Sequence, residues 1–261
     1  MYGSVGVEPK SVQSFTSVDP LAHKYPNVGS YVYCLGNPVK YVDKDGKIPS
    51  PSEGAIMAEH VYSGKAGDKL QGGWKMQRVY KQEGNSSFRG GLYSRTNKDG
   101  KTEYTFATAG TYFENTERGR KSIAEDIKQP FGQSSDMKVS IATAKQISQQ
   151  VGDAELTFVG HSKGGAEAAG NALATNRNAL IFNPAAINAE AYGLDTKSYT
   201  GADEHGMTTF VVGGDFLNDV NSSLGAKPIG NFVMLPQQSN NPIENHKMDA
   251  VKKGLNQNEK K

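Results

Sequence analysis

Short apolar runs separated by glycine-rich turns fill most of the chain after residue 75, and they predict a sheet with helices between its strands. Alternation of apolar and polar residues marks the first strands, and continuous apolar runs mark the later, buried ones. The pattern predicts strands over 76–81, 91–96, 102–108, 156–159, 179–182, 208–212 and 231–235, and helices over 119–128, 137–151 and 166–173. Strand–helix–strand succession of this kind predicts an α/β fold with a mostly parallel sheet.

The stretch from Glu155 to Leu173 holds the most informative motif. An apolar strand runs into Gly160-His161-Ser162-Lys163-Gly164, and an alanine-rich helix follows at once. A strand, G-x-S-x-G and a helix resemble the nucleophile elbow of α/β-hydrolases, in which a strained serine exposes its Oγ at a sharp turn. Glycines are needed two residues before and two after the serine, because side chains there would collide with the neighbouring strand and helix. The alternative is a plain glycine-rich turn.

A serine nucleophile requires a base, and the base requires an orienting carboxylate. In α/β-hydrolases these residues follow in the order serine, acid, histidine. His246 comes after the last predicted strand and fits this order, whereas His205 precedes the first acid candidate. Asp215 closes the strand 208–212 in the run VVGGDFLND, and Asp219 lies four residues further on. We expect Ser162, His246 and Asp215 to form the catalytic set, with His205 and Asp219 as the alternatives.

The hydrolase part of the chain resembles class 3 lipases in three segments. FATAGT (106–111) resembles the F-R-G-T segment that supplies an oxyanion-hole N–H, although it lacks the arginine, and F-N-P (182–184) resembles the segment after the next strand. Asp215 stands in a similar V-x-x-x-D context. The resemblance implies an oxyanion hole made by Lys163, which follows the nucleophile, and by Thr111. The alternative for the FATAGT segment is that Gly110 only ends a strand.

An N-terminal segment, residues 14–47, has a different character. It is a string of turns around one aromatic strand, and its run F-x-S-x-DPLA-x-KYP, Y-x-Y-C and NPV resembles the end of the core domain of bacterial Rhs-repeat proteins. In that family the segment closes a β-cage and a variable toxin follows. Asp43-Lys44-Asp45-Gly46 replaces the family's usual Asp-Pro-x-Gly near the self-cleavage point, so the chain departs from the family pattern where cleavage near Gly46 would occur.

Net charge, cysteine content and the length of apolar runs exclude several classes of protein. The 261 residues carry 29 basic and 27 acidic side chains, and the resulting formal charge of +2 is too small to attract nucleic acid to the chain as a whole. Cys34 is the only cysteine, so neither an internal disulfide nor a cysteine metal cluster is possible. No apolar run reaches the length of a membrane span. We expect an enzyme without metal or cofactor.

Together the pattern and the two resemblances imply four parts: the end of an Rhs core (1–47), a linker with one short helix (48–75), a class 3 lipase-like α/β-hydrolase (76–250) and a polar tail (251–261). The resemblances imply a secreted antibacterial effector that cleaves membrane phospholipid esters in a neighbouring cell. They also imply an Rhs cage, a secretion apparatus and a cognate immunity protein as partners. The alternatives are an esterase or thioesterase with a non-lipid substrate, and a non-enzymatic binding module.

Overall fold

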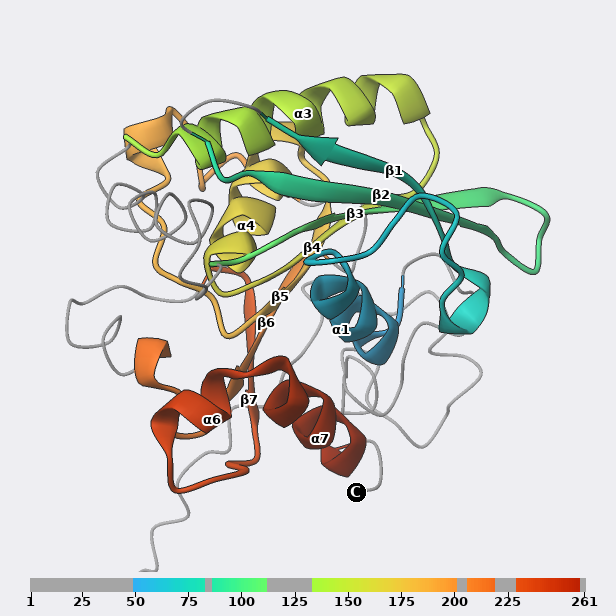
Figure 1. Ribbon diagram of the computed structural model, residues 1–261. Coiled ribbons are helices and arrows are strands. Elements are labelled where there is room, and N and C mark those ends of the chain that lie inside the picture. The colour runs from blue at the N-terminus through green and yellow to red at the C-terminus, as the bar shows by residue number, and fades with distance from the viewer. Residues whose placement is uncertain (1–48, 83–85, 112–132, 201–205, 219–228, 259–261) are drawn as a thin grey trace, which may run out of the picture.

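A seven-stranded sheet organises the computed structural model, which describes residues 49–82, 86–111, 133–200, 206–218 and 229–258. Its strands are arranged in the order of the sequence, and Figure 1 shows them as one twisted layer. The first three strands are antiparallel, and β3 to β7 are parallel. The strands are β1 (Lys75–Lys81), β2 (Arg89–Thr96), β3 (Thr102–Thr108), β4 (Leu156–His161), β5 (Asn178–Phe182), β6 (Met207–Val212) and β7 (Asn231–Leu235). The structure is therefore the mostly parallel α/β sheet that the apolar pattern predicted.

Helices cover both faces of this sheet (Figure 1). On one face α3 packs on α4, and α4 packs on β4 and β5; on the other face α1 packs on α7 and on β3 to β5. The longer helices are α1 (Pro51–His60), α3 (Ser135–Val151), α4 (Lys163–Thr175), α6 (Pro242–His246) and α7 (Met248–Asn258), and short 3₁₀ turns lie at η3 (Gln71–Gly73) and η5 (Glu190–Tyr192). None of the helices in the described ranges combines the length and apolar character that crossing a bilayer requires.

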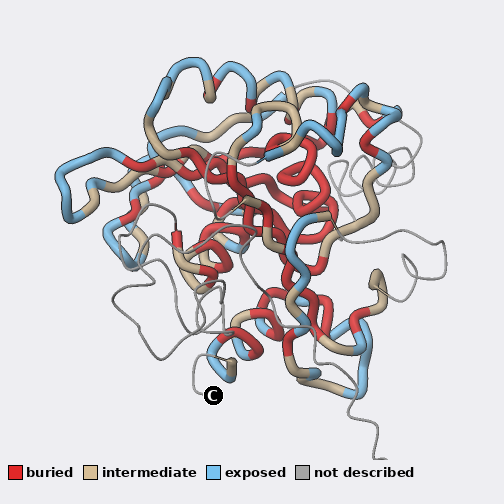
Figure 2. Tube along the Cα trace, turned by 180° about the vertical axis from the view of Figure 1, so that it is seen from behind, coloured by how far each residue is buried: buried red, intermediate tan, exposed pale blue. Residues whose placement is uncertain are grey.

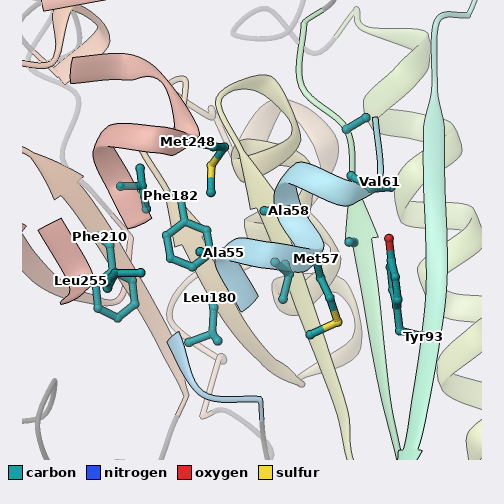
Figure 3. Close-up of a cluster of buried hydrophobic side chains, with 14 of the residues drawn as sticks. Ala55, Met57, Ala58, Val61, Tyr93, Leu180, Phe182, Phe210, Met248 and Leu255 are labelled. Carbon is teal, nitrogen blue, oxygen red and sulfur yellow. The ribbon is translucent and has the colours of Figure 1, made fainter. Parts of the chain in front are cut away.

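The two layers of helices enclose two hydrophobic clusters, one on each face of the sheet. Alternate residues of a strand belong to different clusters: Phe182 lies in the cluster with α1 and α7, and Ile181 in the cluster with α3 and α4. Figure 3 shows the first cluster, in which Met57 of α1 and Leu255 of α7 accompany Phe182. Seen from behind in Figure 2, buried chain runs through the centre of the molecule, and exposed chain lies at its edges.

Helix α1 lies in the segment that we expected to be a linker. The helix predicted there packs against the sheet domain, because Ala55, Met57 and Ala58 are all fully buried in the first cluster. Ser50 begins the helix with a capping box, in which its side chain and that of Glu53 satisfy each other's backbone N–H groups. The sheet domain thus includes this part of 48–75.

The C-terminal segment differs from the sequence prediction. We expected a polar tail from residue 251, whereas the chain is helical up to Asn258 in α7. Val251 and Leu255 lie four residues apart on one face and are fully buried against the sheet. The apolar stripe is only a few residues wide within a lysine- and asparagine-rich segment, which made it inconspicuous in the sequence. The Rhs-like segment 1–47 and the helix predicted over 119–128 lie outside the described residues.

Candidate active site

The turn between β4 and α4 places Ser162 in a backbone conformation that a serine rarely adopts. Its φ is 58° and its ψ is −128°, and the serine is one of only three non-glycine residues with positive φ in the described ranges. A side chain on Gly160 would come within 2.0 Å of the Gly164 carbonyl oxygen, and one on Gly164 within 2.2 Å of the Thr108 carbonyl oxygen. Both glycines are therefore required by close backbone contacts, and the segment is the strained strand–turn–helix that the motif predicted.

Three side chains from distant parts of the chain meet at this turn. His246 Nε2 lies 3.0 Å from Ser162 Oγ, and His246 Nδ1 lies 2.6 Å from Asp215 Oδ2. Ser162 follows β4, Asp215 follows β6 and His246 ends α6, so the parallel strands bring all three to one edge of the sheet. Asp215 is fully buried, and Ser162 and His246 are each 5% exposed. Because the carboxylate can only accept, Nδ1 carries the proton and Nε2 is left to accept from the serine hydroxyl.

The backbone of His246 is held by two buried side chains. Its carbonyl oxygen accepts hydrogen bonds from His161 Nε2 at 2.7 Å and from Asn183 Nδ2 at 3.2 Å. The Asn183 side chain also donates to the Asn245 carbonyl and accepts from the Val212 N–H, so it joins the end of α6 to the end of β6. These contacts fix the C-terminal end of α6, which carries the histidine.

His161 is neutral in this arrangement. Burial, and then the nearby His246, lower the pKa of His161 from 6.5 to about 3. Since Nε2–H donates to a carbonyl, Nδ1 must accept, and the Tyr62 hydroxyl lies 3.2 Å from it. Tyr62 follows α1, in the segment expected to be a linker, so sequence reasoning gave no reason to place it at the site. Asn183 lay in the F-N-P segment that resembled lipases, and this was the available signal for it.

The two residues expected to form the oxyanion hole belong to segments that adjoin Ser162. Lys163 begins α4, and a side chain on Gly110, the residue before Thr111, would approach Ser162 Cβ to 3.2 Å. Thr108 Oγ1 donates to the Gly164 carbonyl at 2.7 Å, so the end of β3 is bonded directly to the elbow. The structure thus brings the segment of Thr111 beside the nucleophile.

The alternative acid and base lie outside the part of the chain that the structure describes, since neither Asp219 nor His205 is included. His60 is engaged elsewhere, with its ring nitrogens 2.9 Å from the Tyr93 hydroxyl and 3.2 Å from Asp68 Oδ2.

A hollow that is open to solvent adjoins the site on the side of β5 and β6, with about 510 Å³ of empty space when the open solvent at its mouth is included. Its wall is mainly aliphatic, and its polar members are Asn183, Thr209, Asp215 and Asn218. Asp215 is itself part of the wall, and other wall residues contact the catalytic candidates: the Ala185 N–H donates to the Ser162 carbonyl, the Asn183 amide to the His246 carbonyl and the Asn218 N–H to Asp215 Oδ1. The remaining wall includes Ala166, Ala169, Ile181 and Val211.

The strand order, the glycine-flanked elbow and the serine–histidine–aspartate arrangement define an α/β-hydrolase. The family model of the Tle-like phospholipase domain matches residues 53–253, most of the chain, and the chain belongs to this family. The protein is accordingly an ester hydrolase of the lipase and phospholipase type.

Solved structures with a similar chain trace are fungal lipases. A mutant form of MDLA from Penicillium cyclopium is 17% identical, with 73% of this chain and 78% of that one covered and a TM-score of 0.47. A triacylglycerol lipase from Penicillium expansum is 17% identical, with 72% and 78% covered and a TM-score of 0.44. The Rhizomucor miehei lipase propeptide complex is 12% identical, with 86% and 83% covered and a TM-score of 0.48. No curated protein matches the chain. Because each TM-score is below 0.5, the fold assignment rests on strand order and elbow geometry.

Proposed function

We propose that the protein hydrolyses phospholipid esters with Ser162 as nucleophile, His246 as general base and acid, and Asp215 as the carboxylate that orients the histidine. The observation that carries the proposal is the pair of contacts made by one imidazole, 3.0 Å to the serine hydroxyl and 2.6 Å to the aspartate. Both lie within hydrogen-bonding distance, as nucleophilic catalysis by this type of site requires.

In the first half-reaction His246 Nε2 takes the hydroxyl proton while Ser162 Oγ bonds to the ester carbonyl carbon. The oxyanion that forms accepts hydrogen bonds from the backbone N–H groups of Lys163 and Thr111. His246 then gives its proton to the leaving alcohol oxygen as the carbon–oxygen bond breaks, which leaves an acyl-serine. Water attacks this ester in the same way, and fatty acid and free serine are released.

The aliphatic hollow is the proposed place of the acyl chain. Its wall includes Ala185, whose backbone N–H donates to the Ser162 carbonyl, and the proposal therefore places the chain next to the nucleophile elbow. Small side chains such as Ala166 and Ala169 leave room for methylene groups, each of which gains about 0.8 kcal/mol on burial. Membership in a phospholipase-like family supports a phospholipid as the donor of this chain.

The proposed biological role is that of an antibacterial effector. The Rhs-like segment 14–47 supports it, because in that family a variable toxin follows such a segment. Delivery in an Rhs cage by a secretion apparatus, action at the membrane of a neighbouring cell and neutralisation by an immunity protein all belong to this proposal.

Release of fatty acid from vesicles of mixed bacterial phospholipids tests the chemistry. We expect release by the wild-type protein and none above background by Ser162→Ala, while Ser198→Ala, which removes an exposed serine hydroxyl distant in the sequence from the elbow, retains wild-type activity. Activity that persists in Ser162→Ala contradicts the mechanism. If soluble short-chain esters are cleaved and the vesicles are not, the phospholipid substrate is wrong.

Expression in bacteria tests the role. We expect the wild-type chain to stop growth when it reaches the membrane, Ser162→Ala to be harmless, and membrane phospholipid to be lost only in the first case. Normal growth with an active enzyme directed to either side of the inner membrane would contradict an antibacterial role.

A further inference from the structure

The side chain of Lys163 turns into the protein, although the residue directly follows the nucleophile. It is 1% exposed, and its Nζ lies 2.5 Å from Asp136 Oδ2 and 3.0 Å from Ser87 Oγ. Asp136 is fully buried in the first turn of α3. A lysine that is buried to this extent normally requires a charged partner, and Asp136 is the nearer one, while Oε1 of the buried Glu167 lies at 4.0 Å.

Asp136 also accepts hydrogen bonds from the segment before β2. Its Oδ1 receives the Ser86 hydroxyl at 2.7 Å and the backbone N–H groups of Ser87 and Phe88 at 2.8 and 3.1 Å. Its Oδ2 receives the Ser87 hydroxyl at 2.5 Å as well as the lysine. We refer to Ser86, Ser87, Asp136 and Lys163 as the Asp136 cluster.

The cluster is connected to both expected oxyanion donors. On one side it holds the side chain of Lys163, whose own backbone N–H is the first donor. On the other side it holds the Phe88 N–H, and the next residue, Arg89, accepts a hydrogen bond from the Ala109 N–H at 2.9 Å. Ala109 is two residues before Thr111, the second donor. One carboxylate therefore lies between the two segments that form the hole.

We propose that Asp136 and Lys163 act as positioning residues for the oxyanion hole, with the buried carboxylate setting the separation of the Lys163 and Thr111 backbone N–H groups. The inference rests on the proposed function and extends it to side chains that do not touch the substrate. An oxyanion hole is effective only when its donors are already in place when the charge develops, and a misplacement of about 1 Å costs on the order of 10²-fold in rate.

The charge balance of the cluster argues for positioning rather than stability. A buried ion pair seldom stabilises a fold more than apolar side chains of the same volume would, because desolvation of both ions offsets their attraction. Burial by itself raises the pKa of Asp136, but Lys163 and the serine hydroxyls outweigh it and keep the pKa below its ordinary value. The carboxylate is thus ionised at neutral pH and able to accept from all its donors.

The test is a Lys163→Met/Asp136→Asn double variant, made in a Glu167→Gln background because the buried Glu167 carboxylate also lies 4.0 Å from Lys163 Nζ, so that removal of the lysine leaves no buried carboxylate behind. We expect kcat on a soluble ester to fall tenfold to hundredfold, in the range of a misplaced donor. KM should stay within threefold, and a trifluoromethyl ketone, which forms an oxyanion on Ser162, should bind more weakly by a similar factor. Ser87→Ala removes only the hydroxyl between the two charges and should lower kcat and ketone affinity by a smaller factor. It serves as the test if the double variant does not fold.

Glu103→Gln is the matched control, because Glu103 is also buried and its Oε2 pairs with Arg95 Nε at 2.8 Å in the β2–β3 hairpin. It should lower the melting temperature and leave kcat within twofold. A folded double variant, or in its absence a folded Ser87→Ala, with wild-type kcat and ketone affinity overturns the inference, as does an equal loss of kcat in Glu103→Gln. These results presuppose ester turnover by the wild type that Ser162→Ala abolishes; without it the proposed function itself fails, and the two failures are distinguishable.

Discussion

Replacement of Asp215 by asparagine tests the site most directly, because it changes charge and hydrogen-bonding pattern but almost no volume. Asp215 Oδ2 faces His246 Nδ1 at 2.6 Å, and Oδ1 accepts the Asn218 N–H at 2.9 Å. An asparagine satisfies both contacts only with its oxygen toward Asn218 and its NH₂ toward the histidine. Nδ1 must then accept, so the proton moves to Nε2, which can no longer take the serine proton.

The fully buried position of residue 215 prevents water from replacing the lost interaction. In serine hydrolases of this type the same exchange lowers kcat about 10⁴-fold, equivalent to about 5 kcal/mol of transition-state stabilisation. We expect a loss of this size for Asp215→Asn, with KM changed little and the melting temperature close to that of the wild type.

The assay is steady-state hydrolysis of a soluble p-nitrophenyl ester, which avoids vesicle binding. Asp219→Asn is the matched control, because the sequence offers that residue as the other acid, and it should retain wild-type kcat. A loss of less than tenfold in Asp215→Asn, or a larger loss in Asp219→Asn, would refute the assignment of the acid.

Three further predictions concern the surroundings of the site. The pKa of His161 is about 3 in the folded protein and near 6.5 when unfolded, so between these pH values the unfolded chain binds the extra proton, and the free energy of unfolding falls as pH drops from 6.5 toward 3, by up to about 1.4 kcal/mol per pH unit. Urea unfolding from pH 7 to 4 should show a shallower decline in His161→Asn than in the wild type, and equal slopes would contradict the neutral ring. Gly160→Ala should cost more than about 2 kcal/mol of unfolding free energy, since its side chain would meet a backbone oxygen at 2.0 Å, whereas in Gly165→Ala the nearest atoms are side-chain carbons at 3.2 Å and the cost should be smaller. Ala169→Phe should fill part of the hollow and lower kcat/KM for decanoyl esters at least tenfold relative to acetyl esters; an unchanged chain-length profile would show that acyl chains bind elsewhere.

The sequence alone was sufficient for the elbow, because its physical requirements are local. A strand, two glycines, a serine and a helix of small residues lie within nineteen consecutive positions, Glu155 to Leu173, and close backbone contacts at the turn allow few other residues. The parallel order of the later strands and the candidate residues Ser162, Asp215 and His246 also followed from patterns along the chain. Short apolar strands separated by helices can bury their surfaces in few other ways.

The contacts around these residues were decided by the tertiary structure. Tyr62 reaches His161 only because α1 packs across the sheet, and the Asp136 cluster joins residues separated by 76 positions at its widest hydrogen bond, from Ser87 to Lys163. Helix α7 was inconspicuous for the same reason, since its apolar face is narrow and is buried by packing on distant elements that include β6 and β7. Periodicity identifies which elements form, whereas burial and pairing of individual polar groups depend on which distant segments the sheet brings together.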